Sequence, residues 1–251
     1  MKAGDFVEHK EYKRIVPVAE SAVLFIHGIA GTPNHFKDFL PLVPKEFSVY
    51  NLLLDGHGGK TEDFSKTSMK KWEMQVNQVV DKLLETHKKI FIVAHSLGTL
   101  LAVEQAIKEK RIEKLFLLAV PIKLFVKPVA LFSAFRIYLG KVPESDEKLV
   151  AMKNCCGINL SKNPFKYLGW IPRFLELFDK IKETRKNIKK LKTNCVIFQS
   201  WDDELVSKKS IAYLEKSISA TVNVLKKSGH YYYESNDMEY LLNEFRKFIF
   251  E

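Results

Sequence analysis

Three residue types that together can carry out acyl transfer occur at separate points of the sequence. Ser96 lies between small residues in Ala94-His95-Ser96-Leu97-Gly98, an Asp202-Asp203-Glu204 cluster comes much later, and His230 follows it. A serine hydroxyl is a weak nucleophile at neutral pH, so it needs a histidine to take its proton and a carboxylate to orient that histidine. The order serine, aspartate, histidine is one in which this chemistry occurs on a parallel sheet.

The sequence around Ser96 predicts a tight strand-to-helix turn. Residues 90–94 are an unbroken apolar run, typical of a buried parallel strand, and from Leu97 the apolar residues recur with helical spacing. Such a turn accepts only small residues two positions before and after the serine, and it lifts the hydroxyl above the sheet. The alternative interpretation is an ordinary helix N-terminus with a capping serine.

A second loop of small residues predicts a site that binds an oxyanion. Residues 22–27 form another strand pattern, which ends in His27-Gly28-Ile29-Ala30-Gly31. Small residues just beyond a strand allow backbone N–H groups to line a concave surface, the form that an oxyanion hole takes. An ordinary strand-to-helix turn is the alternative. Thr32 and Pro33 then predict the start of a helix that extends to about residue 42.

Strand and helix patterns alternate along most of the chain. Further buried strands are expected at residues 47–54, 115–120, 195–199 and 221–225, and helices at residues 68–84 and 237–250. This alternation predicts an α/β fold, with a mostly parallel central sheet that has helices on both faces. His57, in a glycine-rich loop after the strand at 47–54, is expected to brace that loop rather than act as a base.

The alternation stops between residues 121 and 192. This segment has no strand pattern and contains helical pieces at residues 128–140, 146–156 and 164–185. We therefore expect an inserted helical cap at residues 121–192, on a core made of residues 1–120 and 193–251. Aromatic residues of the cap are candidates for an acyl pocket or for the cap's own core: Phe125, Phe132, Phe135, Phe165, Trp170 and Phe174.

The charge of the chain is concentrated in the same segment. The net charge is +10, and residues 121–192 hold 16 Lys and Arg against 6 Asp and Glu, which accounts for the whole excess. The ordinary interpretation is a solvated basic surface, and the alternative is weak association with an anionic membrane surface. No nucleic-acid-binding motif accompanies the charge, so we expect no nucleic acid partner.

Other features of the sequence point to the compartment. The sequence begins without a signal-peptide pattern and contains no apolar run near the ~20 residues that span a bilayer. Its three cysteines include the adjacent pair Cys155 and Cys156, and no metal-ligand spacing is present. We expect a cytoplasmic protein without disulfides, metal or cofactor.

Taken together, the motifs resemble the α/β-hydrolase superfamily, and most of all the bacterial monoacylglycerol lipase-like carboxylesterases. The resemblance rests on residues 27–33, 56–58, 94–98, 203–206 and 228–230, and it is weakest in the cap. It implies that Ser96 is the nucleophile and His230 the base. The family's Asp-x-x-Val pattern falls on Asp203, with Asp202 as the alternative acid. Backbone N–H groups of Ile29 and Leu97 would form the oxyanion hole.

The sequence departs from the family pattern at two positions, and neither carries a reacting atom. Ala94 replaces the usual glycine, and Ser207 stands where proline often follows the valine. The resemblance implies a serine hydrolase that cleaves a small-molecule carboxylic ester, such as a monoacylglycerol, through an acyl-enzyme on Ser96. Two alternatives stay open: a thioesterase or acyltransferase on the same fold, and a non-catalytic ligand-binding protein.

Overall fold

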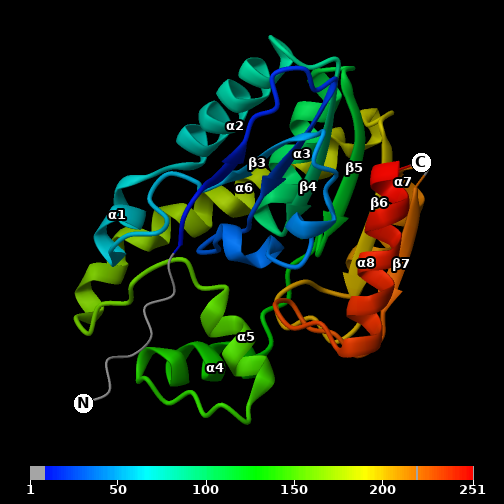
Figure 1. Ribbon diagram of the computed structural model, residues 1–251. Helices are drawn as coiled ribbons and strands as arrows, with labels where there is room; N and C mark the ends of the chain where they lie inside the picture. Colours follow the sequence, from blue (N-terminus) through cyan, green and yellow to red (C-terminus); the bar gives the residue numbers. More distant parts are fainter. Residues whose placement is uncertain (1–8, 219, 251) are drawn as a thin grey trace.

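The computed structural model describes residues 9–218 and 220–250, and a seven-stranded sheet runs through it (Figure 1). The strands follow the spatial order β1-β3-β2-β4-β5-β6-β7, and all neighbours are parallel except β1, which pairs antiparallel with β3. The predicted mostly parallel sheet is therefore confirmed. Its strands are β1 Tyr12–Arg14, β2 Ser21–Ile26, β3 Ser48–Leu52, β4 Lys89–His95, β5 Ile112–Leu118, β6 Asn194–Ser200 and β7 Thr221–Leu225.

The α-helices connect the parallel strands or follow the last one. They are α1 Thr61–Lys66, α2 Met69–Leu84, α3 Leu97–Lys108, α4 Pro128–Tyr138, α5 Glu147–Asn154, α6 Ile171–Asn187, α7 Lys209–Ser217 and α8 Ser235–Phe250. The Ser68 side chain caps α2 by accepting the Lys71 backbone N–H, as the sequence predicts for this helix. Among the described helices, none combines the length and apolar character that a membrane-spanning segment requires.

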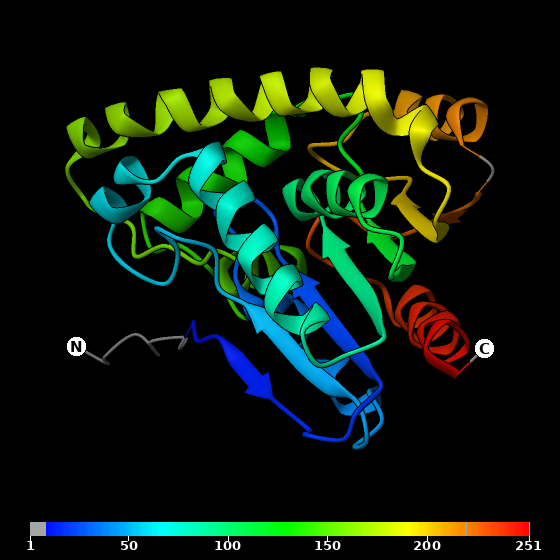
Figure 2. The same cartoon turned by 90° about the horizontal axis from the view of Figure 1, so that it is seen from above.

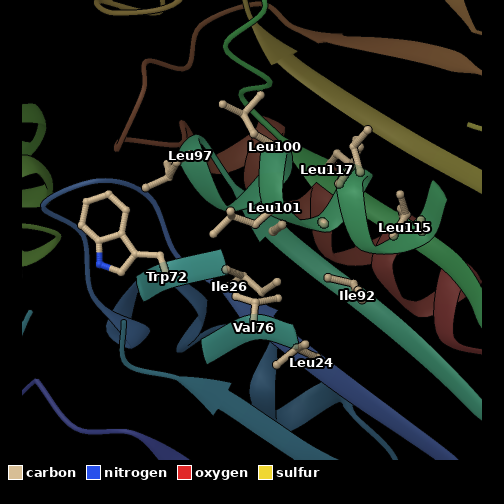
Figure 3. Close-up of a cluster of buried hydrophobic side chains, with 14 of the residues drawn as sticks. Leu24, Ile26, Trp72, Val76, Ile92, Leu97, Leu100, Leu101, Leu115 and Leu117 are labelled. Atoms are coloured by element: carbon tan, nitrogen blue, oxygen red, sulfur yellow. The ribbon is translucent and has the colours of Figure 1, made fainter. Parts of the chain in front are cut away.

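Both faces of the sheet are buried, which is why its strands are continuously apolar. Along β2, Ala22, Leu24 and Ile26 face one hydrophobic cluster, and Val23 and Phe25 face the other. Helices α2, α3 and α6 cover the first face, and α8 covers the second (Figure 2). Figure 3 shows the first cluster, where leucines at the start of α3 pack near Trp72 of α2.

The predicted helix at residues 33–42 is wrong. The chain forms two short 3₁₀ helices there instead, Pro33–Phe36 and Leu40–Leu42. Pro41 explains the break, because its ring removes a backbone donor and clashes with the preceding turn of an α-helix. The short elements β1, α1 and α7 are additional to those predicted, since each is too brief for a clear periodic pattern.

Residues 121–192, which we call the cap segment, lie between β5 and β6 and contain no strand among their described residues. The predicted pieces at 128–140 and 146–156 match α4 and α5 closely. The piece at 164–185 divides into a 3₁₀ helix, Pro164–Trp170, and α6, which starts at Ile171 so that Pro172 falls in its first turn.

The two halves of the cap segment differ in their packing. Helix α6 lies on α2 and α3, where Leu177 and Ile181 join the main hydrophobic cluster. On the same helix, Lys180 is almost fully buried and forms ion pairs with Glu73 of α2 and Glu104 of α3. Helices α4 and α5 instead lie beyond the edge of the sheet, at the bottom of Figure 1. Only the first half of the segment is therefore peripheral.

Candidate active site

Ser96 occupies a strained turn between β4 and α3. Its backbone has φ of +51° and ψ of −121°, a left-handed conformation that non-glycine residues rarely adopt outside special sites. Gly98 permits the turn to lie close to β2, because a Cβ there would be 2.1 Å from the carbonyl oxygen of Ile26. The tight strand-to-helix turn predicted around Ser96 is confirmed, and Ala94 is small enough to be buried beneath it.

The loop after β2 lies directly beside this turn. β2 and β4 are neighbours in the sheet, although the chain forms β3 between them, so the order of strands reverses here. In α/β proteins ligands bind at such a switch point, outside the carboxyl ends of the strands. Gly28 touches the turn at Ser96, since a Cβ on it would lie 2.9 Å from the Ser96 Cβ.

The backbone N–H groups of Ile29, which follows Gly28, and of Leu97, which follows Ser96, have no hydrogen-bond partner among residues 9–218 and 220–250. Leu97 is the first residue of α3, where the N–H groups are free of helical partners and the helix dipole favours negative charge. Ala30 has φ of +51°, and its carbonyl accepts the Gly157 backbone N–H from the cap segment at 2.8 Å.

Gly157 fastens the cap segment to two loops of the core. Its N–H donates to the Ala30 carbonyl, and its own carbonyl accepts a hydrogen bond from the Gly58 backbone N–H at 2.7 Å. A Cβ at this position would lie 1.9 Å from the Gly31 carbonyl oxygen, so only glycine fits without a shift of the backbone. The shape of the loop beside Ser96 therefore depends on a residue of the cap segment.

Asp203 and His230 are brought together at the same edge of the sheet. The His230 Nδ1–H donates to Asp203 Oδ2 at 2.8 Å, and both side chains are almost fully buried. The other carboxylate oxygen, Oδ1, accepts the backbone N–H groups of Leu205 and Val206 at 2.8 and 2.7 Å. This fixes the carboxylate in one orientation, and in the neutral imidazole it places the proton on Nδ1 and the lone pair on Nε2.

The backbone of His230 is held from both sides by residues that the sequence analysis did not identify as functional. The Glu204 carboxylate accepts the His230 backbone N–H at 2.7 Å. On the other side, His95 Nε2 donates to the His230 carbonyl at 3.0 Å. His95 is the residue before Ser96, so the turn at Ser96 contacts His230 directly. Glu204 lies so close to Gly229 that a Cβ there would be 2.5 Å from Oε1.

Asp202, the alternative acid, lies apart from His230. Its side chain is exposed, and its backbone carbonyl accepts a hydrogen bond from Lys127 Nζ at 3.0 Å. The Ser96 hydroxyl makes no hydrogen bond to His230 or to any other described residue. Hydrogen bonds of this kind are often long before substrate binds and become shorter in the substrate complex.

The other buried histidines near the site are poor bases at neutral pH. Burial lowers the pKa of His35 to about 3, with a smaller effect from nearby His230. Burial also lowers the pKa of His57 to about 4, and its Nδ1 donates to backbone carbonyls of its own loop, which confirms the predicted bracing. Burial holds the pKa of His27 and of His95 well below its usual range.

An apolar cavity of about 320 Å³ lies between the loop at Ile29 and the cap segment. Of the aromatic residues singled out in the cap, Trp170 and Phe174 line this cavity. The other four are exposed, with 62, 61, 56 and 76% of Phe125, Phe132, Phe135 and Phe165 accessible to solvent, although Phe132 also lines a second cavity. For these four, the expectation that they form the cap's own core is wrong.

A second cavity of about 270 Å³ shares four of its walls with the first, namely Ala130, Met152, Leu205 and Tyr231. Its remaining lining is mixed, with Phe132 beside charged residues such as Arg136, Lys148 and Glu204. An apolar compartment and one of mixed lining therefore meet beside the loops that carry Asp203 and His230. Within the described part of the chain, no three His, Cys, Asp or Glu residues are placed to hold a metal ion.

The comparisons with known proteins agree with this architecture. Residues 23–242 match the model of the alpha/beta hydrolase family. A structure of the metagenome-derived lipolytic enzymes LipS and LipT superimposes with a TM-score of 0.72 at 17% identity, covering 96% of this chain and 97% of that one. The monoacylglycerol lipase of Paleococcus ferrophilus gives a TM-score of 0.67 at 15% identity, with 95% and 99% covered.

A third structure, a deformylase from Pseudomonas putida S16, gives a TM-score of 0.59 at 15% identity and covers 88% of this chain and 90% of that one. No curated protein is significantly similar to the chain. At these identities the solved structures show the fold, and the family match extends over most of the sequence.

Proposed function

The chain belongs to the alpha/beta hydrolase family, and we propose that within it the protein is a serine hydrolase that cleaves carboxylic esters. The observation that carries this proposal is the buried hydrogen bond from His230 Nδ1 to Asp203, at the edge of the sheet where Ser96 occupies its strained turn. The tautomer that this bond selects has its basic nitrogen, Nε2, free for a serine hydroxyl.

In the proposed reaction, Ser96 Oγ attacks the ester carbonyl while Nε2 of His230 takes the hydroxyl proton. The negative oxygen of the tetrahedral intermediate would accept hydrogen bonds from the backbone N–H groups of Ile29 and Leu97. Leu97 lies at the positive end of the α3 dipole. His230 then gives its proton to the leaving alkoxide, which leaves an acyl group on Ser96. A water molecule attacks this acyl-enzyme in the same way and restores the free serine.

The different linings of the two cavities support a substrate whose acyl and alcohol groups differ in polarity. The compartment beside Ile29 is lined almost entirely by apolar side chains, so it suits an acyl chain. The compartment with Arg136, Lys148 and Glu204 suits a polar alcohol group. We therefore favour esters of a hydrophobic acid with a polar alcohol, such as monoacylglycerols, over small symmetrical esters.

The test measures hydrolysis of p-nitrophenyl esters and labelling by a fluorophosphonate, with wild type compared with Ser96→Ala. We expect wild type to be active and labelled once, and Ser96→Ala to lose both activity and label. A folded wild type that is as inert as Ser96→Ala would contradict the proposal and favour a binding protein. Faster turnover of acyl-CoA than of glycerol esters would favour a thioesterase instead.

A further inference from the structure

The cap segment carries most of the exposed apolar surface of the molecule. Of the 20 large apolar side chains that are exposed among the described residues, 13 lie within residues 121–192. Helix α4 is the extreme case, because Ala130 is its only buried residue although apolar side chains lie on all sides of it. A helix that is apolar all round is ordinarily covered by protein or lipid.

Two neighbouring stretches form this surface, namely residues 125–138, which include α4, and the 3₁₀ helix Pro164–Trp170. Tyr138, at the end of α4, donates its hydroxyl hydrogen to the Lys162 carbonyl at 2.7 Å, and its ring contacts that of Tyr167, with 6.2 Å between centroids. We call the exposed side chains of these two stretches the apolar face of the cap: Phe125, Leu131, Phe132, Phe135, Phe165 and Leu168.

The apolar face is continuous with the apolar cavity. Leu131 of α4, Val126 just before it and Phe174 of α6 are each exposed to solvent and also line the cavity. An apolar molecule on this surface can therefore reach the cavity without crossing a polar barrier. This continuity would be unexpected if the surface were only a packing defect.

The charge around the apolar face selects its partner. Residues 121–170, which carry this face, hold 8 Lys and Arg against 3 Asp and Glu, a net charge of +5, and Lys141, Lys153 and Lys162 are exposed next to its helices. A second copy of the chain would bring a surface of the same sign against this one, at a cost in electrostatic repulsion. A bilayer with anionic headgroups offers apolar depth and opposite charge together, as basic amphipathic surfaces require.

We propose that the apolar face of the cap docks on anionic lipid bilayers, with the opening of the cavity turned toward the lipid. The phenylalanines of α4 and of the 3₁₀ helix at Pro164–Trp170 enter the boundary between headgroups and acyl chains, and the lysines remain among the headgroups. This docking does not require the proposed esterase activity, since it rests on exposure and charge alone.

The test is co-sedimentation with large unilamellar vesicles, made either of phosphatidylcholine alone or of phosphatidylcholine with phosphatidylglycerol. Wild type and Ser96→Ala should both sediment with the anionic vesicles, far less with the neutral ones, and less at high salt. Because Ser96→Ala is included, binding is measured apart from catalysis, and a failure of the esterase proposal leaves the result readable.

Matched variants locate the contact. Phe135→Ser and Phe165→Ser should each weaken binding about tenfold, since each removes one large apolar side chain from the lipid. Met74→Ser is the control, because Met74 is similarly exposed but lies on α2, outside the cap segment. Lys141→Glu with Lys162→Glu should weaken binding to anionic vesicles, whereas Lys82→Glu on α2 should not.

Several outcomes would overturn the proposal. These are a folded wild type that stays in the supernatant, equal binding to neutral and anionic vesicles, or equal losses in Phe135→Ser and Met74→Ser. Dimerisation that depends on Phe135, seen by size-exclusion chromatography with light scattering and without vesicle binding, would identify a second copy as the partner instead. Circular dichroism and hydrolysis of a water-soluble ester verify that Phe135→Ser and Phe165→Ser remain folded.

Discussion

The loops that hold Asp203 and His230 differ from helix α4 in where their side chains find partners. In the loops, His230 is fixed by Asp203 at its ring, by Glu204 at its backbone N–H and by His95 at its carbonyl. On α4, Ala130 is the only buried residue, and four large apolar side chains face solvent: Val129, Leu131, Phe132 and Phe135. Chemistry requires groups fixed to a fraction of an ångström, whereas a docking surface requires groups left uncovered. The same chain provides both, in adjacent regions.

The largest expected effect separates the two aspartates of the acidic loop. Asp203→Asn should lower kcat about 10⁴-fold, because an amide no longer stabilises the imidazolium and favours the wrong tautomer of His230. Asp202→Asn should change kcat less than about twofold, as expected for an exposed side chain. Steady-state kinetics on one soluble ester compares them, and the reverse ranking would assign the acid to Asp202.

The same substitution should lower stability strongly in one region and hardly at all in the other. Phe116→Ala removes a fully buried ring from β5 and should lower the free energy of unfolding by about 3–5 kcal/mol. Phe125→Ala, on the apolar face of the cap, should change it by less than about 0.5 kcal/mol. Urea titrations measure both values. A large loss for Phe125→Ala would mean that the cap segment buries this ring in solution.

Substitutions of Glu204 test whether its hydrogen bond to the His230 backbone N–H positions the imidazole. Glu204→Ala leaves the buried N–H of His230 without a partner, which costs about 1–3 kcal/mol and should lower kcat about tenfold with KM unchanged. Glu204→Gln keeps an acceptor oxygen and should restore most of the rate. If Glu204 instead contacts the alcohol group in the cavity that it lines, KM will change in both variants.

The smallest expected effect, taken per group, is the pH dependence of stability, which belongs to the core because residues 121–192 contain no histidine. The folded-state pKa values of His35 and His57, about 3 and about 4, lie below the unfolded value near 6.5, so the unfolded chain binds more protons between these limits. Stability is therefore lost as the pH falls below about 6.5, by about 1–2 kcal/mol per buried histidine at pH 5.

Urea midpoints at pH 5 and pH 7 test this dependence. His57→Gln removes one titrating group and should reduce the difference between the two midpoints. Equal midpoints for wild type at the two pH values would show that these histidines are protonated in the folded protein.

Features that depend on neighbouring residues could be predicted from the sequence. The turn at Ser96 follows from small residues within two positions of it, and β7 at Thr221–Leu225 has the predicted bounds. The pairing of Asp203 with His230 joins two strand ends, which a parallel sheet places at one edge. In each case local pattern and sheet geometry agree.

The two contacts that hold the backbone of His230 could not be predicted. His95 and Glu204 reach His230 across 135 and 26 residues, and neither has a sequence neighbour that indicates such a contact. The expectation that the phenylalanines of α4 form the core of the cap was wrong for another reason. Because apolar residues lie on all sides of this helix, their spacing does not indicate which side is covered.

The bond from Gly157 to Ala30 limits how this protein could be shortened or recombined. Deleting residues 121–157 as a unit, for example, would also remove the peptide that supports the loop beside Ser96. If a relative's segment replaces residues 121–192, it should therefore provide a glycine at position 157, because otherwise the backbone at Ala30 and Gly31 must shift. The lining of the cavity and the shape of the loop beside Ser96 therefore depend on each other, so a change in one also constrains the other.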